Sequence, residues 1–442
     1  MRTPISDFLR KYADDDNVRL HMPGHKGLCD IEKYDLTEVA GADSLFEASG
    51  IIRESEENAG ELFGARTFFS TEGSSLSIRS MLYLATLYAM ECGRRPIVLA
   101  ARNAHRSFLS SAALIGFDVE WLYSSEGGYL SCRISAEELD LHISSMGSKP
   151  TAVYITSPDY LGNIADIRSL SEVCRKHGAL LLVDNAHGAY LKFIAPSLHP
   201  IDLGADMCAD SAHKTLAALT GAGYLHISKS APAYLSENAK SAMALFASTS
   251  PSYLILDSLD RLNASLFDGY RAKLTTKLDK IEELKKNLIS VCYTLVGDEP
   301  MKITVFTKPY GYTGREISDI LLSRGIVSEF ADSDYLVLMP SLGTSDGELE
   351  RLRSAFAAIP KKVEITDCAP RLSRPEVKMS PRDALLSPSE RIATEDAVGR
   401  VLAEATVACP PAVPIVVSGE VVDESAALAF KYYGIDYIRA VK

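Results

Sequence analysis

Residues 151–184 read "TAVYITSPDYLGNIADIRSLSEVCRKHGALLLVD", and this stretch decides the fold class. It opens with an apolar run at 151–157 and passes into a segment at 167–178 whose apolar residues have helical spacing. It closes with the apolar run "ALLLVD" at 179–184. Apolar strands joined by amphipathic helices indicate a mostly parallel sheet with both faces covered. We therefore expect an α/β protein.

The same alternation extends toward the N-terminus of this stretch. Helical spacing of apolar residues recurs at 74–93 and 105–116, and strand-like runs occupy 96–101 and 117–123. In sheets of this kind, ligands bind beyond the carboxyl ends of the strands. The residues that directly follow each predicted strand are therefore the first candidates for a functional site.

The C-terminal part repeats the alternation on a smaller scale. A long helical region at 252–291 leads into alternating strands and helices over 302–359. Residues 360–395 hold prolines and charges and read as a connecting stretch, and 409–422 read as a Pro-rich turn leading into an apolar strand. We expect three parts, namely an N-terminal arm or interface segment at 1–50, a large domain at 51–295 and a smaller α+β domain at 296–442.

The composition is that of a globular protein with reduced thiols. With 442 residues, 47% of them apolar and 24% charged, the chain can bury a core over more than one domain. A net charge of −12 argues against nucleic acid as the main partner. The eight cysteines include no CxxC pair, which favours free thiols over disulfides or a zinc site. Without an apolar signal core or a membrane-length apolar run, we expect a soluble cytoplasmic protein.

Two charged residues stand in segments that otherwise suit burial. Asp184 ends an apolar strand, and Lys214 lies in "CADSAHKTLAALTGAGYLHI" at 208–227. A carboxylate at the end of a buried strand needs a cationic partner, such as a protonated ring nitrogen. A lysine preceded by Ser211 and His213 in a loop of small residues could form a Schiff base with a carbonyl cofactor. The alternatives, a helix-capping Asp184 and a solvated Lys214, remain open.

Further polar groups follow strands or begin helices. In "TEGSSLS", Ser74 and Ser75 could offer N–H and hydroxyl groups to an anion such as a cofactor phosphate, or could form an ordinary helix cap. His105 follows a strand, where a surface histidine is the default. His187 lies close to Asp184, so hydrogen bonding that supports the site is plausible.

The segment "HMPGHKG" at 21–27 is rich in chemistry-bearing residues but matches no phosphate-binding loop. A Pro-Gly break separates His21 from His25, so the helical spacing that would let them share a metal fails. We expect an ordered loop with an interface or substrate role, and no metal site.

Taken together, these stretches resemble the bacterial ornithine/lysine/arginine decarboxylases, a family of fold-type-I pyridoxal-phosphate (PLP) enzymes. The matching motifs run in family order across nearly the whole chain: "HMPGHKG", "YDLTEVAGADSL", "TEGSSLS", "RNAHRS", "TSPDYLGNIADI", "VDNAHGAY", "DSAHKTL", "STSPSYLILDSLD" and "CPPAVPIVVSGE". The resemblance implies PLP as cofactor and a large domain built on a seven-stranded type of sheet. The chain resembles a short form of the family, which lacks the N-terminal wing domain.

The resemblance also implies a role for each matching residue. Lys214 would hold PLP as an internal aldimine, Asp184 would pair with the pyridinium nitrogen, and His105 would stack on the ring; these three would be catalytic. His187 would lie near the cofactor in a supporting role. The phosphate would be surrounded by Ser74, Ser75, Ser211 and His213. In a homodimer, Thr249 of the neighbouring subunit would also reach the phosphate. Glu420 would receive the distal cation of the substrate.

The chain departs from the family pattern at four places, one of which is "TEGSS" at 71–75, where the family commonly has "NGTS". Asn185 stands where the family usually has an acid, in "DEAHGAH", and Tyr190 replaces the later histidine of that motif. Ala412 makes "PPAVP" where "PPGVP" is usual. The cofactor residues are present, so these departures bear on the substrate pocket.

The leading hypothesis is decarboxylation of arginine or lysine, with ornithine behind them, through a Schiff base and a quinonoid, as a step of polyamine biosynthesis. An aminotransferase or lyase on the same scaffold is an alternative, and a transaminase would need an arginine such as Arg371 or Arg374 for the α-carboxylate. A catalytically silent regulatory homologue is a third hypothesis. Retention of both Lys214 and Asp184 speaks against it.

Overall fold

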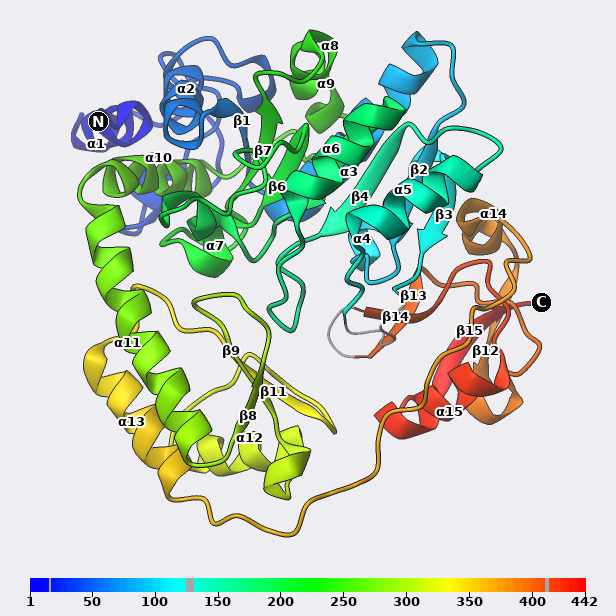
Figure 1. Cartoon of the computed structure of the whole chain (residues 1–442). Helices are drawn as coiled ribbons and strands as arrows, with labels where there is room; N and C mark the ends of the chain where they lie inside the picture. The colour runs from blue at the N-terminus through cyan, green and yellow to red at the C-terminus, as the bar shows by residue number, and fades with distance from the viewer. Residues whose placement is uncertain (16, 125–130, 410–412) are drawn as a thin grey trace. The chain divides into compact units, whose positions relative to one another are not determined.

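The computed structural model describes residues 1–15, 17–124, 131–409 and 413–442 (Figure 1). They divide into two compact units. Unit 1 comprises Met1–Pro96, Ile143–Ile155 and Ile167–Leu274, and unit 2 comprises Ile97–His142, Thr156–Asp166 and Thr275–Lys442. The expected division of the chain at 50/51 and 295/296 remains a prediction.

A seven-stranded sheet carries the fold. Its strands are β1 (Ala65–Ser70), β2 (Ile97–Ala101), β3 (Asp118–Leu122), β4 (Ala152–Thr156), β5 (Leu180–Asp184), β6 (Met207–Asp210) and β7 (Gly223–Ser228). Their order is β1-β7-β6-β5-β4-β2-β3. The pairs β2–β3 and β5–β6 run parallel, whereas β7 runs antiparallel to both of its neighbours. The expected α/β class with a mostly parallel sheet is confirmed.

The strand β5 shows why its sequence forms this structure. All five residues, "LLLVD", are buried, which fits a strand covered on both faces. In the parallel register of β5 and β6, Asp184 lies opposite Ala209. The carboxyl ends of these two strands therefore lie together, and each is followed by predicted site residues.

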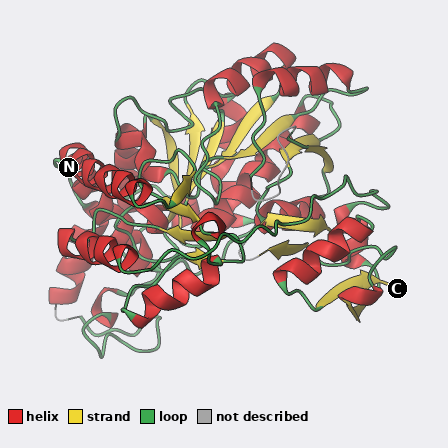
Figure 2. Ribbon diagram, turned by 60° about the horizontal axis from the view of Figure 1, so that its bottom comes forward, coloured by secondary structure: helices red, strands yellow, loops and turns green. Residues whose placement is uncertain are grey.

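Helices of unit 1 pack on the strands of the same unit: α2 on β1, α3 on β6 and β7, and α6 on β5 (Figure 2 colours helices and strands apart). They are α1 (Pro4–Asp14), α2 (Ile51–Phe63), α3 (Gly73–Glu91), α6 (Ile167–His177), α7 (Ala212–Thr215), α8 (Ala233–Glu237), α9 (Ala239–Ala244) and α10 (Tyr253–Phe267), with 3₁₀ turns η1 (Glu32–Tyr34), η2 (Leu45–Glu47) and η3 (Ala189–Phe193). The helix α6 is amphipathic: Leu170 and Cys174 are buried, and Arg175 and Lys176 lie on its outer face. Within the described ranges, no helix combines the length and apolar character that crossing a membrane requires.

Unit 2 contains an antiparallel sheet in the order β10-β11-β9-β8. Its strands are β8 (Thr294–Val296), β9 (Ile303–Phe306), β10 (Phe330–Ala331) and β11 (Tyr335–Leu338), and its helices include α12 (Gly314–Ser323) and α13 (Asp346–Ala357), with the turn η4 (Lys308–Tyr310). Reciprocal capping boxes begin both helices, Thr313 with Glu316 and Ser345 with Glu348. The expected smaller α+β segment is present here.

The rest of unit 2 consists of short elements. They are α4 (Arg106–Ile115), α14 (Pro381–Leu386), β12 (Ser389–Ala393), η5 (Thr394–Asp396), β13 (Thr406–Cys409), β14 (Val413–Val417), α15 (Glu424–Tyr433) and β15 (Tyr437–Val441). Two antiparallel pairs, β12–β15 and β13–β14, complete the sheets. The helices α5 (Ala136–Ser145) and α11 (Tyr270–Ser290) each contain a boundary between the units.

The structure corrects two expectations about the chain's organisation. The helical region at 252–291 is two helices, α10 and α11, because the chain breaks at Gly269, whose φ of +69° no helix interior accepts. Residues 360–395 are more than a connection, since α14 and β12 form within them. The strand expected within 409–422 is β14, but Pro410, Pro411 and Ala412 lie outside the described residues.

Candidate active site

Lys214 lies on α7, the one-turn helix that follows β6. The carbonyl of Ser211, whose backbone is extended, accepts the N–H of Lys214 at 3.2 Å. Ala212 and Thr215 are buried, whereas the Lys214 side chain is exposed, with its Nζ 3.1 Å from Nε2 of His187. We expected Lys214 in a loop of small residues, but it lies on a helical turn. The buried residues Ala212 and Thr215 anchor this turn and leave the lysine side chain exposed.

Asp184 is buried at the end of β5 and is held by two hydrogen bonds. Its Oδ2 accepts the hydroxyl of Tyr154 at 3.0 Å, and its Oδ1 accepts the N–H of Ala186 at 3.2 Å. Burial, and next the neighbouring Asp184 carboxylate, raise the pKa of the Tyr154 hydroxyl well above its usual value, so that hydroxyl remains a donor. A carboxylate can accept more than two hydrogen bonds, so Asp184 retains capacity for a cationic N–H.

Hydroxyl groups meet where α3 begins. Ser211 donates through its Oγ to Oγ of Ser74 at 2.9 Å, and both residues are buried. Ser75 follows in the first turn of α3, whose leading N–H groups lack helical partners. This helix is 19 residues long, so its dipole favours an anion at that end.

His213 and two glycines close the same corner of unit 1. Nδ1 of His213 lies 2.9 Å from the carbonyl oxygen of Ala222, so this nitrogen carries the ring proton in the neutral tautomer. Gly73 has a φ of +65°, and a Cβ placed there would lie 3.5 Å from Cε1 of His213. A Cβ on Gly223 would come within 2.9 Å of the Gly73 backbone, so only glycine lets β7 approach the start of α3.

Unit 1 therefore brings most of the predicted site residues together through direct bonds and short chain connections. Asp184 is three residues from His187, which contacts Lys214, and Lys214 is three residues from Ser211, which bonds Ser74. The set supplies an amine for a carbonyl, a buried carboxylate for a protonated ring nitrogen, and hydroxyl and N–H donors for a phosphate. These are the groups that PLP requires, so the residues fit this cofactor.

His105 and Glu420 belong to unit 2 and are described within it. His105 caps α4: its Nδ1 accepts the N–H of Ser107 at 3.2 Å. Glu420 is buried, and its Oε2 lies 2.7 Å from Nη2 of Arg102 and 2.9 Å from the N–H of Val417. Burial raises the pKa of Glu420, and Arg102 opposes that rise. A cation thus already accompanies the residue expected to receive the substrate's distal cation.

Thr249 lies in an exposed segment of unit 1 between α9 and α10. Its expected contact with the phosphate of a neighbouring subunit stays a prediction, as do the ring-stacking role of His105 and the phosphate roles of Ser75 and His213.

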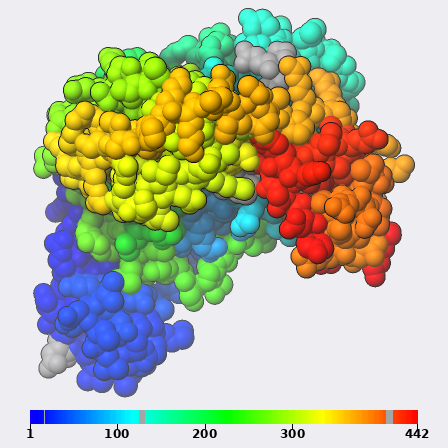
Figure 3. Space-filling view, turned by 90° about the horizontal axis from the view of Figure 1, so that it is seen from below, coloured from blue at the N-terminus to red at the C-terminus, as the bar shows by residue number. Residues whose placement is uncertain are grey.

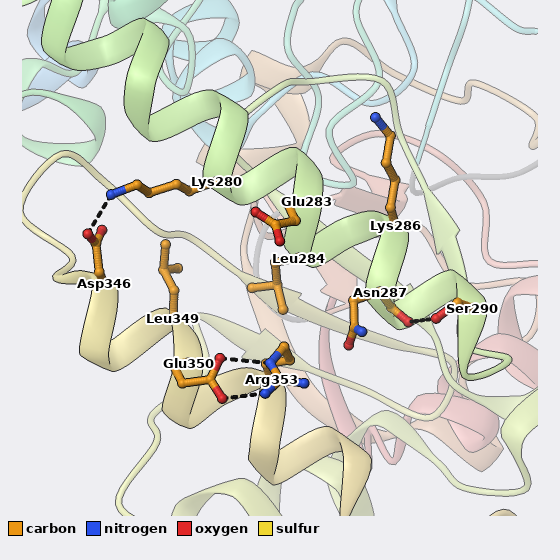
Figure 4. A pocket seen from close by; sticks show the side chains of 10 residues that line it. All are labelled: Lys280, Glu283, Leu284, Lys286, Asn287, Ser290, Asp346, Leu349, Glu350 and Arg353. Atoms are coloured by element: carbon orange, nitrogen blue, oxygen red, sulfur yellow. Dashed lines mark hydrogen bonds and ion pairs between the residues drawn. The ribbon is translucent and has the colours of Figure 1, made fainter.

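A surface cleft of about 710 Å³ lies in unit 2 between α11 and α13 (Figure 4). Charged side chains line it, and several of them pair with one another, Lys280 with Asp346 and Arg353 with Glu350. It contains none of the predicted site residues. We assign it no role in catalysis.

Two sequence profiles match the chain. The profile of the Orn/Lys/Arg decarboxylase major domain matches residues 3–309, and that of the Orn/Lys/Arg decarboxylase C-terminal domain matches residues 366–439. The chain belongs to this family. The cofactor is PLP, and the enzyme is an amino-acid decarboxylase, as the resemblance implied.

Curated relatives match the sequence of the decarboxylase over nearly its whole length. An arginine decarboxylase of Halalkalibacterium halodurans is 28% identical, over 96% of this chain and 92% of its own. An arginine decarboxylase of Bacillus subtilis is also 28% identical, over 97% of this chain and 93% of its own.

Solved structures show the same fold. The lysine decarboxylase LdcF of Francisella novicida superposes with a TM-score of 0.81 at 17% identity, covering 100% of this chain and 81% of its own. The constitutive lysine decarboxylase of E. coli superposes with a TM-score of 0.79 at 18% identity, and the match covers 100% of this chain and 82% of its own. The decarboxylase thus has the fold-type-I architecture, with a smaller C-terminal domain.

Sequence reasoning missed several residues that hold this site. Tyr154 supports Asp184 from the neighbouring strand β4. Asp210 and His226 are further buried polar groups, inside otherwise apolar strands of the decarboxylase. A polar residue within an apolar strand run is the signal that could have drawn attention to each of these.

Proposed function

We propose that this decarboxylase acts on a basic L-amino acid, arginine or lysine ahead of ornithine, and forms the corresponding amine and CO₂. One observation carries the proposal: the Asp184 carboxylate is held buried at a strand end while Lys214 is presented on a turn beside His187. The arginine decarboxylases that match the chain over almost its full length support the substrate class.

Each residue would perform a step suited to its geometry. Lys214 would bind the carbonyl of the cofactor through Nζ, and Asp184, whose carboxylate Tyr154 orients, would hold a proton on the ring nitrogen. When bound, PLP supplies a conjugated ring that accepts the electron pair released as CO₂ leaves the substrate. His187, 3.1 Å from Nζ of Lys214, can exchange a proton with the amine. The Lys214 amine would also be the group that gives a proton to Cα.

Glu420 is the proposed recognition group for the distal cation of the substrate. Its Oε1 has no hydrogen-bond partner among the described residues, while Oε2 pairs with Arg102. A buried carboxylate oxygen without a donor is costly, and a substrate ammonium or guanidinium group would satisfy it. Recognition through Glu420 would thus share the carboxylate with Arg102.

A substrate panel tests the proposed reaction. CO₂ release is measured from arginine, lysine and ornithine side by side, with the PLP-loaded protein. We expect release from arginine or lysine at a kcat/KM at least tenfold above that from ornithine. Keto-acid formation without CO₂ would support the aminotransferase alternative, in which Arg371 or Arg374 binds the α-carboxylate; Arg374 instead lies 4.9 Å above the Tyr123 ring. PLP binding without any turnover would support the silent homologue.

We further propose a homodimer that shares its active sites. Large apolar side chains are exposed along the N-terminal segment, part of whose surface appears in blue in Figure 3, and they are Val18, Leu20, Met22, Leu28 and Ile31. Apolar patches of this kind mark interaction surfaces, and a second copy is the commonest partner of an enzyme. The exposed Thr249 would then reach the phosphate of that copy.

A cytoplasmic location and a role in polyamine biosynthesis complete the proposal. The seven cysteines whose state the structure describes are all free thiols, which suits a reducing compartment. Decarboxylation of a basic amino acid yields a diamine or an aminoalkyl guanidine, the class of compound from which polyamines are built.

A further inference from the structure

A cluster of buried polar side chains lies at the carboxyl ends of β5 and β6 in unit 1, outside the roles assigned above. Its centre is Asp210, the last residue of β6. Around it lie Asn185, His199, Cys208 and His226, and all five residues have 0% of their surface exposed. Burying a carboxylate completely is costly unless every oxygen is bonded, so this cluster needs an explanation.

Each oxygen of the Asp210 carboxylate has its own partners. Oδ1 accepts an N–H of the Asn185 side-chain amide at 2.8 Å and lies 3.2 Å from Sγ of Cys208. Oδ2 lies 3.0 Å from Nε2 of His199 and 3.3 Å from Nε2 of His226. The carboxylate is therefore surrounded by donors.

The protonation of the cluster follows from these bonds. Nδ1 of His199 accepts the N–H of Ile201 at 3.4 Å, so Nε2 of His199 carries the hydrogen and donates to Asp210. Burial alone would raise the pKa of Asp210, but the imidazoles of His199 and His226 outweigh it and hold that pKa well below its usual value. Asp210 is thus a buried carboxylate anion.

A metal ion is the alternative explanation, since ligand atoms of His199, Cys208 and Asp210 lie within 4.8 Å of one another. A metal would need the thiolate of Cys208. Sγ of Cys208 instead donates to Oδ1 of Asp210 at 3.2 Å, and Nε2 of His199 donates to Oδ2 at 3.0 Å, so the candidate ligand atoms bond to one another. Burial, and next the Asp210 carboxylate, also raise the pKa of this thiol well above its usual value. The cluster is a hydrogen-bonded network.

The network joins the two chain segments that carry the site. Asn185 directly follows Asp184, and its backbone N–H also donates to the carbonyl of Ala209 at 3.0 Å. Asp210 directly precedes Ser211, where the turn that presents Lys214 begins. The bond between Asn185 and Asp210 therefore ties the strand end with the carboxylate to the strand end with the lysine.

We propose that Asp210 is a positioning residue which, through Asn185, fixes Asp184 relative to Lys214 for cofactor binding. The inference rests on the proposed roles of Asp184 and Lys214. It also gives a physical meaning to Asn185 in this chain: because Asp210 supplies the negative charge, an amide rather than an acid must face it. Two facing carboxylates in this buried cluster would repel each other.

The test compares Asp210→Asn with the exchanged pair Asn185→Asp/Asp210→Asn. In the single variant the new amide cannot accept from both Asn185 and His199, so one bond is lost. In the exchanged pair, the amide oxygen at position 210 accepts from His199 and the amide N–H donates to the new carboxylate at position 185. The bond between the two strand ends is thus restored with reversed polarity, and the bond from Sγ of Cys208 is lost. The measurement is a PLP titration of the apo-protein, followed by the visible absorbance of the lysine-bound cofactor as a function of pH.

We expect Asp210→Asn to raise the Kd for PLP at least tenfold and to shift the pH midpoint of the visible band by at least half a unit. The exchanged pair should return both quantities to within threefold and 0.2 units of wild type. If Asp210→Asn does not fold, Asn185→Ala provides the same readout, because it removes the amide donor and leaves Asp210 with its imidazoles. The expected changes then have the same direction and a smaller size.

Asp260→Asn is the matched control. Asp260 is also buried in unit 1, but its oxygens accept from the Ser6 N–H and the Ser55 hydroxyl, and it adjoins neither Asp184 nor Lys214 in the chain. It should alter stability without altering the band or its pH midpoint. A folded Asp210→Asn protein with wild-type affinity and pH midpoint would overturn the inference, as would an exchanged pair no better than the single variant. A wild type that binds PLP but decarboxylates no basic amino acid would contradict the proposed function and leave this comparison intact.

Discussion

At the scale of single residues, the site depends on how its carboxylates are held. Asp184 takes hydrogen bonds from the Tyr154 hydroxyl and the Ala186 N–H, whereas Glu420 takes them from Arg102 and Val417. In the first arrangement both donors are neutral groups, which leaves the pairing with a cation to the cofactor. The second contains a guanidinium, which partly neutralises the carboxylate before any substrate arrives.

Replacing Tyr154 by Phe should weaken cofactor binding while preserving the fold. The change removes one donor to Asp184 at 3.0 Å and leaves the ring volume almost unchanged. A lost hydrogen bond to a buried charge is worth about 1.5–3 kcal/mol, so the Kd for PLP should rise roughly tenfold to a hundredfold. Wild-type affinity in the Tyr154→Phe variant, measured by PLP titration, would remove Tyr154 from this role.

Asp184→Ala, which removes the carboxylate itself, should reduce kcat by at least two orders of magnitude.

Asp260 should make stability depend on pH in the acidic range. Burial, opposed by hydrogen bonds from Ser55 and Ser6, raises the pKa of Asp260 to about 6, above its usual value of 3.8. The folded protein therefore binds this proton more tightly than the unfolded chain, and the associated stability is lost as pH rises from about 4 to 6. Relative to Asp260→Asn, the wild type should lose up to ~3 kcal/mol over this window. Denaturant unfolding at several pH values measures the difference, and parallel curves for the two proteins would contradict it.

At the scale of elements, the site depends on close packing of β7 against the start of α3. Gly73 and Gly223 make this approach possible, because side chains at these positions would enter occupied space or require an unfavourable φ. The helix end that faces the proposed phosphate position is thereby fixed to the sheet. The same sheet carries Asp184 and the turn with Lys214.

Replacing Gly223 by Ala should displace the start of α3. The added Cβ would meet the Gly73 backbone carbon at 2.9 Å and the Asp210 carbonyl oxygen at 3.0 Å, and backbone atoms cannot move aside cheaply. We expect a loss of about 1–3 kcal/mol in the free energy of unfolding and at least a fivefold rise in the Kd for PLP. Gly147→Ala is the control, since nothing lies within 4 Å of its new Cβ. Equal behaviour of the two variants would show that the approach of β7 to α3 is not critical.

At the scale of the whole molecule, the proposed homodimer depends on the exposed apolar side chains of the N-terminal segment. The side chains of Leu20 and Leu28 are 89% and 85% exposed. Leaving such large apolar side chains in water is unfavourable, and a dimer interface would bury them. The Leu20→Asp/Leu28→Asp variant should sediment as a species of the chain mass, whereas the wild type should sediment at twice that mass. Val363→Asp is the control, because this residue is 90% exposed but lies in unit 2. A wild type that sediments as a monomer would exclude the dimer.

The fold and the core of the site were predictable to different extents. The periods of apolar residues predicted α3, α4 and α6 and strands β2 to β5 close to their observed ends, because burial along one element is a local pattern. The break at Gly269 and the strand β12 were not foreseen, since a single glycine or a short edge strand carries little periodic signal. The family motifs identified Lys214 and Asp184 as the residues to examine.

The sequence by itself determined the α/β class, the family, the cofactor and the two residues expected to hold it, because these follow from local pattern and from motifs in order. Only the tertiary structure decided which groups support them. Tyr154 meets Asp184 across 30 positions, Lys214 meets His187 across 27, and Asp210 meets Asn185 across 25. Such pairs depend on the register of neighbouring strands and on the turns that follow them, and these are fixed by packing of the whole sheet rather than by any one segment.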